Sequence, residues 1–288
     1  MKAIRYHSYG DSRVLALEET DRPAAGPGQV VVKVAGTSFN LLDAAIRAGI
    51  MQEAMPIDFP HTPGVDVSGT VAETGEGVTG WSTGDRVIAF LPPTAPGAAA
   101  EYVAVPADLL AAAPVSVPLP DFKPGQRLLI NGAGGAVGGY AIQLAKRAGA
   151  DVTATASPRS LDRVKTAGAD RIVDYTAGAV AKTLAGEHFD AVLQLVRDTP
   201  EETAALADLV ADGGAFTSTT IPGPQTARIR VEHVYVANDP ARLADLVALV
   251  DAGELRIDVA ERLPLADLPS VHDRAVEGRL LGKTVLTP

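Results

Sequence analysis

The strongest chemical signal in the sequence is a glycine-rich run, NGAGGAVGG, at residues 131–139. Within it, Gly132, Gly135 and Gly138 are spaced three apart, between a strand-like segment, RLLIN, and a helical pattern that ends AIQLAKRAGA. Glycines at such a turn let the backbone approach a pyrophosphate, and the N–H groups at the start of the helix point at the anion. We therefore predict a dinucleotide-binding turn, in preference to an Asn-Gly hairpin followed by a loop. The candidate contacts are Gly132, Gly135, Ala136, Val137 and Gly138.

The end of the next strand-like segment, DVTATA, indicates which dinucleotide would bind. NAD sites usually place an acid about 20 residues after the turn, on the ribose hydroxyls. Here the segment is followed by Ser157, Arg159 and Ser160, and no acid precedes Asp162. Hydroxyls and a guanidinium suit a 2′-phosphate, so we expect NADPH. The alternative is an ordinary polar loop in which Ser157 caps the next helix.

Two patterns of secondary structure surround these residues. The first hundred residues contain short β-branched runs bounded by Gly, Pro and Asp, which are typical of a small barrel. One helical stretch, residues 40–48, interrupts them and ends at Gly49. From Arg127, strands alternate with helices, which predicts a parallel, doubly wound sheet. The fold class is therefore α/β.

Composition excludes several classes of function. The 288 residues carry a net charge of −10, which is unlike a nucleic-acid-binding protein. There is no cysteine, so disulfides, thiolate zinc sites, iron–sulfur clusters and thiol nucleophiles are all excluded. The N-terminal residues have no apolar signal segment, and the longest uncharged run holds five glycines and an asparagine. We expect a cytoplasmic protein with no membrane partner.

Several strings occur in the order of a known family: SFNLLDAAIRAG, PGVDVSGTV, GDRV, LLINGAGGAVGGYAIQLAK and the terminal GKTVLTP. On these motifs the chain resembles the zinc-free quinone oxidoreductase branch of the medium-chain dehydrogenase/reductase superfamily. The resemblance implies a GroES-like barrel from residues 1–118 and 255–288, and an inserted NADP-binding Rossmann domain from residues 119–254. It also implies an active site in a cleft, a small electrophilic acceptor as substrate, and Tyr175 as a further cofactor contact.

The resemblance also bears on metal binding. In zinc-dependent relatives a cysteine stands where this chain has Asn40, and a His–Glu pair corresponds to Val65–Asp66. Asp66 and Asp85 are thus interpreted as turn and barrel residues, and no metal site is expected. Without a Lewis acid, the acceptor must already be electrophilic. We expect NADPH-dependent hydride transfer to a quinone or an α,β-unsaturated carbonyl.

Asn40 is the candidate catalytic residue, which would orient the carbonyl or the nicotinamide. Its alternative role is to cap the helix that follows it. Tyrosines that quinone reductases often carry nearby are replaced by Ala45 and Met51, so water is the expected proton source. Between Pro120 and Asp121 the family's crossing helix has no counterpart in this sequence. Either the protein has lost the helix, or the natural chain carries additional residues here; we favour the second, because loss of the helix would uncover the cofactor cleft. An intact mass clearly above 29.7 kDa would support it.

Other functions and the assembly state stay open at this point. An enoyl or alkenal reductase of the same fold, or a non-catalytic sensor or structural protein that binds NADP(H), fits the same residues. The segment RIRVEHVYV, residues 228–236, reads as the last strand of the Rossmann sheet, with an apolar edge that would be hazardous if exposed. The family often pairs this edge across a two-fold axis, so we expect a homodimer.

Overall fold

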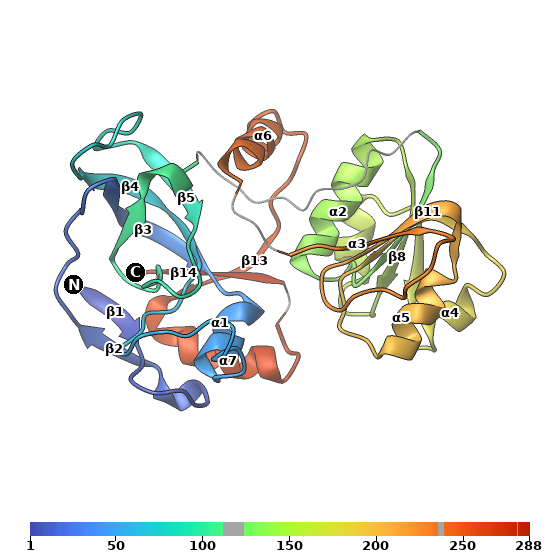
Figure 1. Cartoon of the computed structure of the whole chain (residues 1–288), viewed down its shortest axis with the longest axis horizontal. Helices are drawn as coiled ribbons and strands as arrows, with labels where there is room; N and C mark the ends of the chain where they lie inside the picture. Colours follow the sequence, from blue (N-terminus) through green and yellow to red (C-terminus); the bar gives the residue numbers. More distant parts are fainter. Residues whose placement is uncertain (112–123, 236–238, 281) are drawn as a thin grey trace. The chain divides into compact units, whose positions relative to one another are not determined.

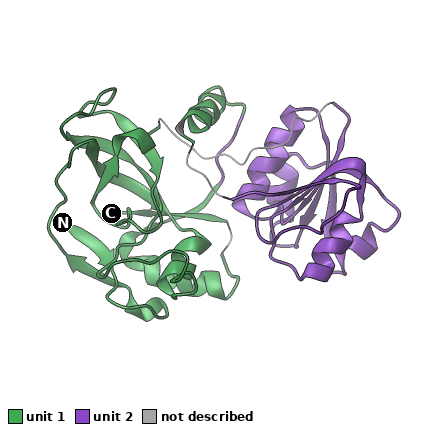
Figure 2. Cartoon of the chain, viewed as in Figure 1, with its two compact units in different colours: residues 1–116, 238–254, 259–288 green, residues 117–237, 255–258 purple. Residues whose placement is uncertain are grey.

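The chain divides into two compact units, which Figure 2 shows in different colours. Unit 1 comprises residues 1–116, 238–254 and 259–288, and unit 2 comprises residues 117–237 and 255–258. The computed structural model describes residues 1–111, 124–235, 239–280 and 282–288. The junction of Pro120 and Asp121 therefore lies outside the described residues. Among the described helices, none is long and apolar enough to span a membrane.

Unit 1 is built on a six-stranded sheet that combines strands β3 to β6 with the C-terminal strands β13 and β14, while β1 and β2 form a separate two-stranded sheet (Figure 1). The sheet order is β13-β14-β3-β4-β5, and β6 pairs antiparallel with residues 29–33 of β3. The C-terminal strand β14 pairs antiparallel with β3, which places the last residues beside the first barrel strand. The strands of unit 1 are β1 (Lys2–Arg5), β2 (Ala16–Glu19), β3 (Gln29–Ser38), β4 (Asp66–Thr74), β5 (Arg86–Phe90), β6 (Tyr102–Pro106), β13 (Val259–Pro264) and β14 (Lys283–Thr287).

Alternation of side chains explains the core of this sheet. Along β4, Val67, Gly69 and Val71 are buried, while Ser68 and Thr70 between them are half-buried. These valines join Val30, Val32 and Val87 in one apolar cluster, as expected for β-branched residues on the inner face of a barrel. The β-rich first hundred residues thus form the predicted barrel-type unit.

Helix α1 (Leu41–Arg47) ends as the sequence predicts, at Gly49, whose φ of 76° lies in the left-handed region. Its last residue, Arg47, is buried and contacts α7 (Leu268–Val276): Nε donates to Nδ1 of His272 over 3.2 Å. Nη1 of Arg47 donates to the Gly10 carbonyl oxygen over 2.6 Å. Helix α6 (Pro240–Asp251) also groups with unit 1, whereas the sequence-based ranges assign it to the Rossmann domain.

Unit 2 is a parallel sheet in the order β12-β11-β10-β7-β8-β9. This is the doubly wound arrangement, in which the strand order reverses between β7 and β10. Leu128 and Ile130 of β7 pack on the side of α2, while Leu129 packs on the opposite side with Phe189. Helices cover both faces, which accounts for the nearly continuous burial of the central strands. The elements are β7 (Arg127–Asn131), α2 (Ala136–Arg147), β8 (Asp151–Ala156), α3 (Leu161–Ala167), β9 (Arg171–Asp174), α4 (Val180–Thr183), β10 (Phe189–Gln194), α5 (Pro200–Ala207), β11 (Val210–Ser218) and β12 (Arg230–His233).

Candidate functional site

The glycines of the turn between β7 and α2 differ in why the structure requires or tolerates glycine at each position. Gly132 has a φ of 92°, which favours glycine, and a Cβ there would lie 2.6 Å from Cγ2 of Val196. A Cβ on Gly138 would lie 2.4 Å from Cα of Ala133, so only glycine lets α2 pack this close to the turn. At Gly135, the residue before α2, a Cβ would meet only one atom, 3.5 Å away. The exposed start of α2 is thus accessible to an anion.

A buried polar network holds the turn from behind. The Gly132 N–H donates to Oγ1 of Thr155 over 2.8 Å, and that hydroxyl donates to Oδ1 of Asn131 over 3.0 Å. Nδ2 of Asn131 donates to Oε1 of Gln194 and to Oδ2 of Asp198, at 2.8 and 3.1 Å. The network joins the carboxyl ends of β7, β8 and β10, where doubly wound folds bind their ligands.

The residues predicted to contact a 2′-phosphate come together after β8. Ser160 is buried, and its Oγ accepts the Ser157 N–H over 3.1 Å. A Cβ on Gly134 would lie only 2.6 Å from the same Oγ, so the loop packs directly against the glycine turn. The Tyr175 N–H donates to the carbonyl of Ala156, which precedes Ser157, and the Tyr175 side chain is half exposed. Arg159 is exposed in the same loop. Ser160 and Tyr175 thus flank one loop that abuts the glycine turn.

One cation near this turn was missed by the sequence analysis. Arg163 of α3 donates from Nη2 to the carbonyl oxygen of Gly134, and its Nε lies 3.7 Å from Oδ2 of Asp258. It stands three residues after Ser160, the spacing that puts two helical residues on one side. That spacing could have indicated that Arg163 lies on the same side of α3 as Ser160. Nothing in the sequence indicates its contact with the glycine turn, 29 residues earlier.

Unit 1 contains a separate polar cluster around Asn40. Its Nδ2 donates to Oδ2 of Asp66 over 2.9 Å and to the Ser38 carbonyl over 3.2 Å. Oγ of Ser38 donates to the same Asp66 oxygen. The side chain of Asn40 is therefore engaged with the sheet, while its backbone N–H donates to Oδ2 of Asp43 at the start of α1. Asp66, interpreted from the sequence as a barrel residue, begins β4 and is the centre of this cluster.

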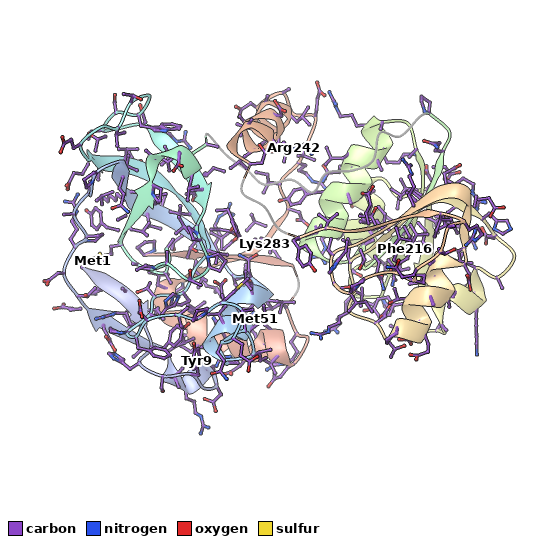
Figure 3. All side chains as sticks on the ribbon, viewed as in Figure 1. Met1, Tyr9, Met51, Phe216, Arg242 and Lys283 are labelled. Atoms are coloured by element: carbon purple, nitrogen blue, oxygen red, sulfur yellow. The ribbon has the colours of Figure 1, made fainter. Side chains whose placement is uncertain are left out.

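Lys283, labelled in Figure 3, completes the cluster from the start of β14. Its Nζ lies 2.9 Å from Oδ1 of Asn40 and 3.3 Å from Oδ2 of Asp66. The sequence analysis did not single out this lysine, because 243 residues separate it from Asn40. The available signal was its place in the terminal GKTVLTP string.

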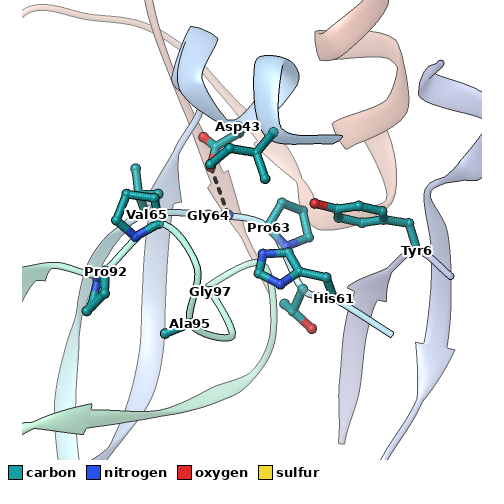
Figure 4. Close-up of a pocket in the computed structure, with 12 residues that line it drawn as sticks. Tyr6, Asp43, His61, Pro63, Gly64, Val65, Pro92, Ala95 and Gly97 are labelled. Carbon is teal, nitrogen blue, oxygen red and sulfur yellow. Dashed lines mark hydrogen bonds between the residues drawn. The ribbon is translucent and has the colours of Figure 1, made fainter. Parts of the chain in front are cut away.

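Asp43, labelled in Figure 4, is buried and adjoins this cluster, because its Oδ2 accepts the Asn40 N–H. Its Oδ1 accepts the Gly64 N–H over 3.1 Å. Burial raises the pKa of Asp43 to about 7, and the nearby Asp66 carboxylate acts in the same direction. The adjoining cavity, lined by Tyr6, Asp43 and His61 among others, has a volume of about 10 Å³. That volume accommodates one water molecule and no organic acceptor.

The residues at this corner do not fit a zinc ion. Zinc sites in proteins use three or four protein ligands, drawn from thiolates, imidazoles and carboxylates. Here Asp66 supplies a single carboxylate, beside an amide, a hydroxyl and the ammonium of Lys283, whose positive charge opposes a metal ion. In the described part of the chain, no three His, Asp or Glu side chains form a group that could bind a metal.

Comparisons with known proteins agree with this architecture. A family model described as the alcohol dehydrogenase GroES-like domain matches residues 26–115, and one described as zinc-binding dehydrogenase matches residues 167–286. A chloroplastic quinone-oxidoreductase homolog of Spinacia oleracea is 30% identical, covering 100% of this chain and 98% of its own. The chain belongs to the quinone oxidoreductase branch of the medium-chain dehydrogenase/reductase superfamily, a family of oxidoreductases. The predicted α/β fold class is confirmed.

Further relatives extend the comparison. A mitochondrial NAD(P)H oxidoreductase of Mus musculus is 30% identical over 90% of this chain and 82% of its own. An NADPH-dependent alkenal/one oxidoreductase of Arabidopsis thaliana is 37% identical over 61% of this chain and 53% of its own. The quinone oxidoreductase structure from Coxiella burnetii aligns with a TM-score of 0.86 at 26% identity, covering 100% and 99% of the two chains. The Escherichia coli quinone oxidoreductase complexed with NADPH, at 23% identity, shares the fold, with a TM-score of 0.85 and full coverage of both chains.

Proposed function

We propose that this protein is an NADPH-dependent oxidoreductase that reduces a quinone or an α,β-unsaturated carbonyl without a metal ion. The observation that carries the proposal is the glycine turn of unit 2, with an exposed helix start at Gly135 and a loop of hydroxyls and Arg159 beside it. Relatives named quinone oxidoreductase and alkenal/one oxidoreductase support the choice of acceptor class.

The residues of unit 2 fit a dinucleotide. The N–H groups of Ala136 and Val137, at the start of α2, would hold the pyrophosphate, because the open space at Gly135 lets an anion approach them. The 2′-phosphate would contact the loop that abuts the turn. When bound, the reduced nicotinamide supplies a hydride. The residues proposed for the 2′-phosphate are Ser157, Arg159, Ser160 and Tyr175.

The acceptor class follows from the chemistry of the polar cluster in unit 1. A Lewis acid assists oxidation of a simple alcohol by lowering the pKa of its hydroxyl, and the cluster around Asn40 does not fit a metal. A conjugated carbonyl or a quinone is already electrophilic, and its reduction places negative charge on an oxygen. Hydrogen-bond donors aimed at that oxygen suffice to stabilise the charge.

The test is oxidation of NADPH by the purified chain against quinones, enones, enals and simple alcohols, with and without a chelator. We expect turnover of quinones or enones that the chelator does not change. Chelator-sensitive oxidation of simple alcohols, with no reduction of quinones or enones, would overturn the proposal. The same panel separates the alternatives: enals alone identify an alkenal reductase, and NADPH binding without turnover identifies a sensor or structural protein.

Substituting Arg159 by alanine should weaken NADPH binding at least about tenfold and leave NADH binding unchanged. A hydrogen bond from a charged donor contributes about 1.5–3 kcal/mol, and only NADPH carries the 2′-phosphate. The measurement is a fluorescence titration of both cofactors. Lys182→Ala, which removes one exposed positive charge from α4 of the same unit, is the matched control and should change neither affinity. Equal losses for NADPH and NADH in Arg159→Ala would show that the 2′-phosphate binds elsewhere.

We also propose that the protein is cytoplasmic and forms a homodimer. Strand β12 is the edge of the sheet of unit 2, and Tyr235 beyond it is 75% exposed. Unpaired edges invite pairing with another chain. Light scattering at micromolar concentration tests the assembly, and a monomer mass alone would refute it.

A further inference from the structure

Two segments of unit 1, residues 39–40 and the start of β4, converge on an ammonium group that a third segment, β14, carries. Nζ of Lys283, at the start of β14, lies near Oδ1 of Asn40, Oδ2 of Asp66 and the carbonyl oxygen of Phe39, at 2.9, 3.3 and 3.4 Å. The pairing of β14 with β3 and of β3 with β4 brings these positions together. The cluster is therefore a product of the fold and not of any local motif.

Two of the three contacts of Lys283 are long. Hydrogen bonds from nitrogen to oxygen cluster near 2.9–3.0 Å, so only the bond to Asn40 has ordinary length. An oxygen atom that approaches Nζ can replace the contact with Asp66 or with Phe39 at small cost. The side chains of Lys283 and Asp66 are 24% and 23% exposed, so the cluster is open to a small molecule.

The partners of Lys283 are held independently of it. Asp66 accepts from the Ser38 hydroxyl and from Nδ2 of Asn40, so its carboxylate stays in place when the lysine changes partner. Nδ2 of Asn40 donates both of its hydrogens to protein acceptors, Ser38 and Asp66. Within this cluster, Lys283 is therefore the donor whose long contacts a ligand oxygen can replace. The next residue, Leu41, is 71% exposed and offers apolar surface to a flat ring.

We infer that Lys283 is a catalytic residue, whose ammonium group donates to the carbonyl oxygen of the acceptor and transfers a proton to it. Asn40 and Asp66 are positioning residues that hold the ammonium. This inference rests on the proposed function. The hydride for this reduction would come from a reduced nicotinamide cofactor. When a hydride forms a C–H bond on the acceptor, the displaced electron pair moves to the acceptor oxygen. That oxygen takes a proton from Nζ, and the neutral amine regains one from water. Water, the proton source expected from the sequence, thus acts on the amine and not directly on the acceptor.

The first test uses binding and needs no turnover. p-Nitrophenolate carries the negative oxygen that the reduced acceptor develops, and its absorbance reports ionisation. We titrate it into the full chain, with and without NADP⁺, and compare p-nitroanisole, a neutral molecule of nearly the same shape. For Lys283→Met we expect the dissociation constant of p-nitrophenolate to rise at least about tenfold, with that of p-nitroanisole unchanged.

Two further variants separate charge from structure. Lys283→Arg keeps the positive charge and should restore most of the phenolate affinity. Lys33→Met removes an exposed lysine of β3 in the same unit and should change neither ligand. With NADPH and a quinone, Lys283→Met should lower kcat about 100-fold while KM for NADPH stays constant.

Three outcomes would overturn the inference: no phenolate binding by the wild type, equal phenolate affinity in Lys283→Met, or equal loss of phenolate and anisole binding. The last would show that Lys283 only supports the structure. If the wild type reduces quinones and any of these occurs, the assignment of Lys283 alone fails. If the wild type oxidises NADPH with none of the acceptors, the proposed function itself fails.

Discussion

Replacing Gly138 by alanine should lower the activity about 100-fold and destabilise unit 2 by about 3 kcal/mol. The added Cβ would lie 2.4 Å from Cα of Ala133 and 2.7 Å from its carbonyl atoms. These are backbone atoms, so no side-chain rotation relieves the overlap, and α2 must move away from the turn. A displacement of about 1 Å at a binding site is enough for a loss of this size. Steady-state oxidation of NADPH with a quinone, and urea unfolding followed by circular dichroism, measure the two effects.

The adjacent glycine gives a matched control of opposite sign. Gly139 lies in the same helix, and a Cβ there has no atom within 4 Å. Gly139→Ala should keep NADPH affinity and stabilise the protein by about 0.5–1 kcal/mol, because alanine favours a helix. If the two substitutions have the same effect, close packing of α2 at Gly138 does not position the cofactor site.

The stability of unit 1 should increase by about 1.4 kcal/mol per pH unit between pH 5 and 6, the slope for one proton. Three buried groups produce this slope. Burial lowers the pKa of His272 to about 3 and of His61 to about 4, so both are neutral when folded and protonated when unfolded. Burial raises the pKa of Asp43 to about 7, so it holds a proton only when folded. The unfolded chain therefore binds one more proton, and stability rises with pH.

The environment of His272 explains why its ring stays neutral. Nδ1 accepts from Nε of Arg47, so a proton on that nitrogen would displace the bond and face a cation. Phe39 packs edge-on against the ring, with centroids 4.9 Å apart. The carboxylate of Asp273, which has the opposite effect on the pKa, accepts the Ser12 hydroxyl. Burial and Arg47 together outweigh Asp273.

Two substitutions should change the slope in opposite directions. His272→Asn keeps an acceptor for Arg47 but does not titrate, so the slope should fall to about zero. Asp43→Asn removes the opposing group, so the slope should rise to about 2.7 kcal/mol per pH unit. Urea unfolding followed by the fluorescence of Trp81 measures this, because Trp81 is the single tryptophan and packs against the core of unit 1. Parallel slopes in all three proteins would contradict the assignment.

Local features of the fold were predictable because their causes are local. The strand-turn-helix at Asn131 follows from glycines flanked by an apolar strand and a 3.6-residue pattern, and it forms as predicted. Helix α1 ends at Gly49 because only the residues around it decide its backbone angles. The grouping of α6 with unit 1 was harder to predict, because it depends on contacts with residues that are distant in the sequence.

The amino-acid sequence by itself determined the α/β class, the parallel order implied by alternating strands and helices, and the residue types of the cofactor turn. These depend on periodicity and on backbone preferences within about 20 residues. Only the tertiary structure decided which groups the Asn40 side chain contacts, because its partners Asp66 and Lys283 lie 26 and 243 residues away in the sequence. The pairing of β14 with β3 and of β3 with β4 brings these side chains together in space. Contacts between strands so far apart in the sequence produce no periodic pattern from which they could be predicted.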